Sequence, residues 1–283
     1  MSTTINAIRA GLLRGRIEFR QMVTTPQDLW NNVFPSLIYL VVMFFTRGTT
    51  VPGTDFSLGA RTLPSLLGMV VVFSGVTTMM MALSVEREDG TLLRAKAVPG
   101  GMVGYLVGKM VLVATMTLAN VAIILLPSLL FLDGLSVGSL TAWATLLGIL
   151  VLGMIATLPA GALLGAMLNN PRNSGVVMLP LLGLVAISGI FYPATGFPDW
   201  LQTVAYAFPI YWLGLGMRSA LLPHEMAAVE SAGSWQHLET VGVLGAWAVT
   251  GLIVAPIVLR RMARRESGST VTARRERALR HPA

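Results

Sequence analysis

Long runs of apolar residues recur along this sequence and decide what it can fold into. A helix needs about 20 apolar residues to cross the hydrocarbon core of a bilayer, which is about 30 Å thick. Six segments meet or approach this length: 27–46, 63–84, 103–131, 141–168, 174–192 and 240–259. Only 12% of the residues are charged, about half the share of a soluble domain. The sequence therefore predicts an all-α integral membrane protein with six transmembrane helices.

The basic residues indicate which way the chain crosses the membrane. If both termini are cytoplasmic, only Arg47, Arg61 and Arg218 of the 20 Lys and Arg residues lie outside. This satisfies the positive-inside rule, by which Lys and Arg concentrate in cytoplasmic loops. A seventh span at 206–222 would export the basic C-terminal tail, so we reject it. We therefore expect a multi-pass protein of the cell membrane with both termini in the cytoplasm.

The spans form one transmembrane domain, residues 1–260, with a distinctive segment at each end. In residues 5–25, apolar side chains recur at helical spacing beside an arginine cluster. This pattern predicts an amphipathic helix on the cytoplasmic leaflet, and a partly disordered arm is the alternative. Residues 261–283 are polar and basic. They are typical of a solvated tail near anionic lipid and do not favour a nucleic-acid partner.

The segment 86–98 carries the most closely spaced charges between two spans. Its first residues, Glu-Arg-Glu-Asp, end the second span, and Gly90 permits a sharp change of direction. Residues 91–97 can then form a short helix, which the following Pro-Gly-Gly stops. A short helix held between two spans suits the transmission of movement from a soluble partner. An ordinary charged loop is the alternative.

These residues resemble type-2 ABC-transporter permeases, the membrane subunits of bacterial drug and lipid exporters, including the daunorubicin-resistance permeases. The residues similar to that family's coupling-helix region are Glu86, Arg87, Glu88, Gly90, Thr91, Leu92, Pro99, Gly108 and Lys109. A second resemblance begins at Gly-Ile-Phe-Tyr-Pro, residues 189–193, and ends at Arg218. It corresponds to the family's region between the fifth and sixth spans. Leu93 departs from the family, whose members often carry a polar residue there.

The resemblance implies an ATP-driven exporter of an amphipathic drug, lipid or similar compound, with multidrug efflux and antibiotic resistance as its typical roles. Two copies of a cytoplasmic ABC ATPase would dock on a coupling helix at 86–98, and a second permease copy or a paralogue would complete a dimer. The first and fifth spans would form its interface. The residues implied in coupling are Glu86, Arg87, Glu88, Asp89, Gly90, Thr91, Leu92 and Arg94.

The same resemblance implies short re-entrant helices on the outer side, at 193–222, that cap the exit of the pathway. The residues implied in this outer gate are Phe191, Tyr192, Pro193, Phe197 and Trp200. The alternative is aromatic anchoring at the outer interface without a gate. Its anchoring residues would be Trp200, Tyr206, Tyr211 and Trp212.

We expect no catalytic, metal or nucleotide site in this chain. It has no cysteine, and Gly104–Met110 lacks both the glycine spacing and the Ser/Thr of a phosphate-binding loop. ATP and magnesium would belong to the partner ATPase. We interpret Gly104 and Gly108, with Gly100, as a small-residue face for helix packing, and Gly161-x-x-x-Gly165 as another. Lys109 is expected to extend to the cytoplasmic surface.

Two other functions are weighed against export. An ion-gradient-driven secondary transporter or channel predicts carboxylates within its spans, and none of the 13 acidic residues lies deep in a predicted span. Sodium held by backbone carbonyls and hydroxyls stays open. A membrane-embedded enzyme is not favoured, because all three His lie in a loop or the tail.

Overall fold

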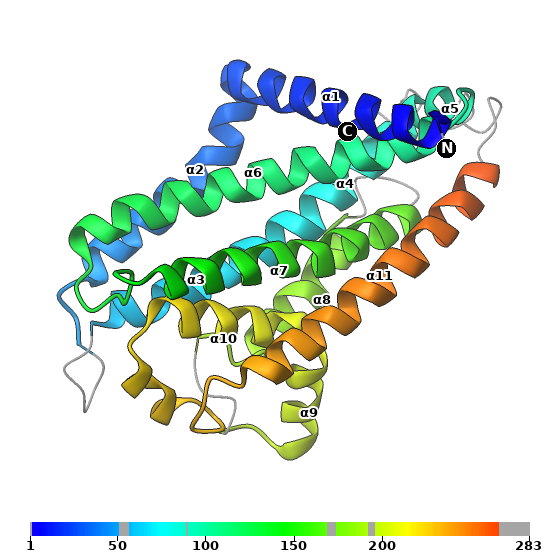
Figure 1. Cartoon of the computed structure of the whole chain (residues 1–283). Helices are drawn as coiled ribbons and strands as arrows, with labels where there is room; N and C mark the ends of the chain where they lie inside the picture. The colour runs from blue at the N-terminus through cyan, green and yellow to red at the C-terminus, as the bar shows by residue number, and fades with distance from the viewer. Residues whose placement is uncertain (1, 51–56, 89, 169–173, 192–195, 266–283) are drawn as a thin grey trace.

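The computed structural model describes residues 2–50, 57–88, 90–168, 174–191 and 196–265. In this part of the chain every regular element is a helix, and an isolated bridge between Thr50 and Ser57 is the one β-type pairing. Long helices pack side by side, and α1 and the end of α11 lie at the same end of the bundle (Figure 1). The predicted all-α fold is confirmed.

Five helices are long and apolar enough to cross a membrane. Among the described residues they are α2 (Pro26–Thr46), the continuous rod α3–η1–α4, α6 (Gly101–Phe131), α7 (Leu140–Met167) and α11 (His237–Arg265). The rod consists of α3 (Leu58–Phe73), the π-helical turn η1 (Ser74–Thr78) and α4 (Met79–Glu88). Five of the six predicted spans are therefore helices of spanning length.

The remaining predicted span, 174–192, contains a shorter helix. Here α8 (Ser174–Ile187) has 14 residues, which at 1.5 Å per residue cover about 21 Å of a core about 30 Å thick. Residues 169–173 and 192–195, on either side, lie outside the described residues. Helix length alone therefore does not confirm a sixth span.

The N-terminal helix α1 (Ser2–Thr24) packs along α6 through small residues. A Cβ added to Gly11 would lie 2.5 Å from the carbonyl oxygen of Gly104, and one added to Gly15 would lie 2.7 Å from that of Gly108. Only residues without side chains allow this approach. The predicted packing role of Gly104 and Gly108 is confirmed.

Similar close packing joins α7 to the rod. A Cβ at Gly161 would lie 2.5 Å from the carbonyl oxygen of Val76, and one at Gly165 would lie 2.8 Å from that of Met80. The second predicted small-residue face is therefore also confirmed.

The short helix α10 (Pro209–Leu221) follows α9 (Asp199–Ala207) and precedes η4 (His224–Val229). Nearly every residue of α10 is buried, mainly against α3 and α7. Tyr211 and Trp212 are 1% and 6% exposed, so the prediction that they anchor the outer interface is wrong. Trp200 on α9, which is 68% exposed, remains free to do so.

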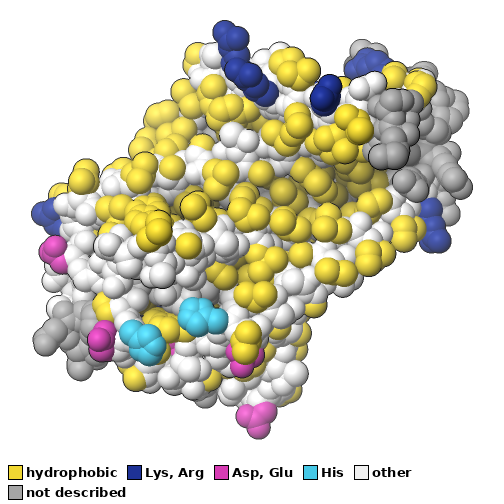
Figure 2. Space-filling view, in the orientation of Figure 1, with side chains coloured by type: hydrophobic (Ala, Val, Ile, Leu, Met, Phe, Trp, Pro, Cys, Tyr) yellow, Lys and Arg dark blue, Asp and Glu magenta, His cyan; other side chains and the backbone are white. Residues whose placement is uncertain are grey.

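Charge and apolar surface separate along the molecule. Figure 2 shows apolar side chains over the middle of one face, with Lys and Arg gathered near α1 and the end of α11. Acidic and histidine side chains of this face gather toward the opposite end. This face of the molecule thus has an apolar middle between two polar ends.

Candidate functional site

The connection between α4 and α6 contains the short helix predicted for this segment. α5 (Thr91–Lys96) lies between Gly90 and Gly100, whose φ angles are +81° and +71°. Both angles lie in the left-handed region that side chains other than glycine rarely adopt. The two glycines therefore reverse the chain on either side of α5. We call residues 90–100 the α5 segment.

The α5 segment has a buried anchor and an exposed side. Leu92 is only 1% exposed, whereas Val98 is 60% exposed. Arg94, Ala97 and Pro99 are also exposed, and Arg94 donates a hydrogen bond of 2.9 Å from Nη2 to Thr91 Oγ1. One side of the segment is fixed to the bundle, and the other is available to a partner.

Next to the α5 segment, four charged side chains from three helices meet in what we call the four-charge cluster. They are Arg14 and Glu18 of α1, Glu86 of α4 and Lys109 of α6. Lys109 Nζ donates to Glu18 Oε2 at 2.6 Å and forms an ion pair with Glu86. Arg14 Nε donates to Glu18 Oε1 at 2.6 Å. The cluster joins α1, α4 and α6 and has no net charge.

Lys109 is 5% exposed, so the expectation that it extends to the surface is wrong. Two carboxylates offset the cost of burying its charge. Burial alone would raise the pKa of the Glu18 carboxyl, but hydrogen bonds from Lys109 and Arg14 outweigh that effect and lower this pKa below its ordinary value. Sequence reasoning missed Arg14 and Glu18, although their four-residue spacing on a helix is typical of an ion pair.

The other residues expected in coupling have different surroundings. Arg87 donates from Nη1 to the carbonyl oxygens of Ala166 and Leu168, at 3.2 and 3.0 Å, at the end of α7. Asp89 lies outside the described residues, and the Glu88 side chain is not described. Glu86, Arg87 and Leu92 therefore hold the segment to the bundle, and Arg94 is the exposed charge among the described side chains of this segment.

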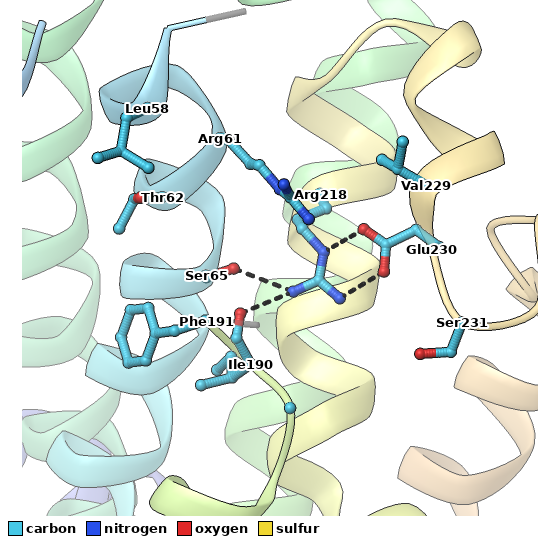
Figure 3. Close-up of a pocket in the computed structure, with 11 residues that line it drawn as sticks. Leu58, Arg61, Thr62, Ser65, Ile190, Phe191, Arg218, Val229, Glu230 and Ser231 are labelled. Carbon is cyan, nitrogen blue, oxygen red and sulfur yellow. Dashed lines mark hydrogen bonds and ion pairs between the residues drawn. The ribbon is translucent and has the colours of Figure 1, made fainter. Parts of the chain in front are cut away.

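At the opposite end of the bundle, a buried arginine links three elements (Figure 3). Arg218 of α10 donates to both carboxylate oxygens of Glu230, at 2.7 and 2.9 Å. Its Nη1 donates to Ser65 Oγ of α3 and to the carbonyl oxygen of Ile190, both at 3.0 Å. Sequence reasoning placed Arg218 and Glu230 outside the membrane and did not pair them.

Of the five residues expected in the outer gate, the structure describes Phe191, Phe197 and Trp200. Phe191, 41% exposed, lines a pocket with Arg218. Phe197 and Trp200 are not among the residues that line this pocket. Tyr192 and Pro193 lie outside the described residues.

A comparison with protein families decides the class of this molecule. The model of the "ABC-2 family transporter protein" family matches residues 46–257, about three quarters of the chain. The chain belongs to the ABC-2 transporter family. A search of curated proteins gave no match.

Membership of the ABC-2 family makes the chain a transmembrane subunit of an ABC transporter and a multi-pass membrane protein. It also implies an ABC ATPase as partner, because ABC-2 proteins are membrane transport components and not enzymes by themselves. The matched residues include the α5 segment and the Arg218–Glu230 pair, whereas α1 lies before them.

Proposed function

We propose that this ABC-2 permease is moved by two copies of a cytoplasmic ABC ATPase that dock on the exposed side of the α5 segment. The observation that carries the proposal is the two-sided form of that segment, buried at Leu92 and exposed at Arg94 and Val98. ATP and magnesium would be bound by the ATPase. Closure of the ATPase dimer would then push on α5.

In this mechanism the four-charge cluster would transmit the displacement of α5 to the long helices of the bundle. Lys109 and Glu86 tie α6 to α4, Glu18 ties α1 to α6, and Arg14 ties α1 to α4. A displacement of α5, which contacts α4 and α6, would therefore move three helices together. The hydrogen bond from Arg87 to Ala166 would connect the end of α7 to the same movement. In this mechanism the coupling residues Glu86 and Arg87 transmit force and do not touch the ATPase.

The π-helical turn η1 offers a place for the rod to bend. π-helical turns inside α-helices are frequent at functional sites. In this one, Ser74 Oγ lies 2.7 Å from Thr117 Oγ1 of α6. The contact between Gly75 and the Thr157 side chain joins it to α7. A tilt of α4 would be transmitted to α6 and α7 through these two contacts of η1.

The transported compound would be amphipathic, such as a drug or a lipid. An apolar cavity of about 410 Å³ lies among the rod, α7, α8, α10 and α11, beside η1. Val76, Leu164, Leu181 and Trp247 are among its lining residues. Its size is within the range of sites for drug-sized ligands, so it suits the apolar part of such a compound. Multidrug efflux, antibiotic resistance and a daunorubicin-permease-like specificity are the roles that we propose to examine first.

The segment 174–191 would complete a six-span topology. Because Arg87 contacts the end of α7, and α11 contacts α5, α7 and α11 both end on the α5 side. The chain must therefore cross back between them, and α8 with the residues after it is the available crossing. Both termini would then be cytoplasmic in a cell-membrane protein, and the α9–α10 hairpin would be re-entrant on the outer side.

A second copy of the chain, or a paralogue, would pair through the exposed apolar faces of α2 and α8. Phe45 on α2 is 77% exposed, and Val176 and Leu179 on α8 are 71% and 73% exposed. Lipid would cover whatever part of these faces the partner leaves open.

Acidic substitutions on the exposed side of the α5 segment test the docking of the ATPase. In membranes that contain both proteins, Arg94→Glu and Val98→Asp should each reduce the ABC ATPase that co-purifies with the permease, by about tenfold for a disrupted interface contact. Arg47→Glu is the matched control, because Arg47 is exposed at the other end of the bundle. Undiminished ATPase in both α5 variants would refute the docking, as would concentrative transport by the chain alone on a sodium or proton gradient.

A further inference from the structure

Among the described residues that line the pocket beside Arg218, positive charges outnumber negative charges. The volume of the pocket is about 160 Å³, and two guanidinium groups and one carboxylate line it. The charged residues are Arg61 of α3, Arg218 of α10 and Glu230, which follows η4. Figure 3 shows the Arg61 side chain reaching from α3 toward Arg218. The described residues of the lining thus have a net charge of +1.

The carboxylate of Glu230 is already occupied by Arg218. Both of its oxygens accept hydrogen bonds from that guanidinium, a bidentate arrangement. Arg218 also donates to Ser65 and Ile190, which leaves one of its five N–H groups without a bond to a described residue. This pair is neutral and structural.

Arg61 is the charge that remains. It is partly buried, and among the described residues its guanidinium group makes no hydrogen bond or ion pair. A partly buried cation that lies close to another cation raises the electrostatic free energy of the site unless an anion is nearby. Thr62 and Ser231 add hydroxyl groups to the same pocket, and Phe191 adds an apolar wall.

We propose that this pocket binds a phosphate group, the headgroup of an anionic amphipathic compound. Arginine binds phosphate with two parallel N–H donors, and Arg61 has them free of other described partners. The pocket is smaller than the roughly 300 Å³ at which sites for drug-sized ligands begin. It can therefore hold a headgroup, while Phe191 and Val229 at its wall contact the adjoining apolar chain. This site is separate from the α5 segment and does not depend on the proposed coupling.

The test measures lipid retention by the full chain in the absence of an ATPase. The protein is placed in phosphatidylcholine nanodiscs that contain phosphatidic acid and diacylglycerol with the same acyl chains, and native mass spectrometry counts the retained molecules. We expect retention of phosphatidic acid over diacylglycerol. Arg61→Gln should weaken this retention by about tenfold, the effect of losing a charge-assisted hydrogen bond, and Arg61→Lys should weaken it less.

Arg47→Gln is the matched control, because Arg47 lies at the same end of the bundle, on the Phe44 ring and outside the pocket. Its retention of phosphatidic acid should equal that of the unaltered chain. Because Arg61 has no described partner, Arg61→Gln should keep the thermal unfolding temperature of the unaltered protein. Equal retention in the Arg61→Gln and Arg47→Gln variants would overturn the proposal.

A second arm separates two sources of phosphate. If millimolar inorganic phosphate displaces phosphatidic acid from the unaltered chain but has no effect on Arg61→Gln, the ligand is a soluble phosphate compound. If phosphatidic acid stays bound, the ligand is a lipid headgroup. Either result supports the phosphate site, and the binding readout leaves the test of ATPase docking independent.

Discussion

At the scale of single residues, the buried lysine of the four-charge cluster connects charged groups of different helices. The Lys109 side chain is 7% exposed and lies between Glu18 and Glu86, whose side chains are 19% and 15% exposed. Removing one member of a buried ion pair costs more than the pair contributes, because the remaining charge stays buried without its partner. Lys109 therefore contributes to holding α1, α4 and α6 together.

Lys109→Met tests this role. The change leaves two carboxylates facing each other with only Arg14 nearby, so we expect the free energy of unfolding to fall by about 3 kcal/mol. Thermal unfolding of the purified protein in detergent measures the loss. Lys109→Arg should keep most of the stability, and adding Glu18→Gln to Lys109→Met should restore part of it. A Lys109→Met protein as stable as the original would contradict the role.

The sequence carried only part of the information about this cluster. A lysine eight residues into an apolar helix, and an Arg–Glu pair four residues apart, are both visible in the sequence. Their meeting depends on how α1 lies on α6, which is set by tertiary packing that no local pattern encodes. The same reason explains why Arg218 and Glu230, twelve residues apart, were not paired.

At the scale of elements, close packing of the two backbones holds α1 to α6, in addition to the ion pair between Glu18 and Lys109. The glycines at positions 11 and 15 bring the two helices close enough for Glu18 to reach Lys109. α1 is also outside the residues that match the ABC-2 family model.

Gly11→Leu should separate the two helices. The new side chain would meet the Gly104 backbone and the Val107 side chain, neither of which can move away without moving α6. We expect hydrogen exchange of the α1 amides to become at least about tenfold faster, as in a locally opened segment. Gly245→Leu is the matched control, because Gly245 lies within α11 with open space around it. Unchanged exchange in α1 of the Gly11→Leu protein would show that charge alone holds the helix.

The helices themselves were largely predictable, and the exceptions have a common cause. Apolar length and periodicity indicate that a segment is a helix in an apolar environment, but not whether lipid or protein supplies that environment. α10 is too short to span and is buried by α3 and α7. Consequently Tyr211 and Trp212, which the sequence suggested for the membrane interface, lie in the core.

At the scale of the whole molecule, the charge distribution and the path of the chain indicate the same membrane topology. Basic side chains gather at the end that holds α1 and the end of α11 (Figure 2), and the positive-inside rule would place this end in the cytoplasm. α7 and α11 both end there, so the chain has to return to the other end of the bundle between them, and the six-span proposal assigns this crossing to α8. Orientation and span number can therefore be tested together.

The absence of cysteine from the sequence makes this test direct. Single cysteines at Gly48, Gly138, Gly196 and Val98 would occupy exposed positions, and the three glycines have open space around them. In intact cells, a membrane-impermeant maleimide should label Gly48→Cys, Gly138→Cys and Gly196→Cys, because all three lie outside in a six-span chain. Val98→Cys, on the α5 segment that the proposed orientation places in the cytoplasm, should react only after the cells are opened. Labelling of Val98→Cys in intact cells would reverse the orientation, and a Gly196→Cys protein protected in the same way as Val98→Cys would show that α8 does not cross.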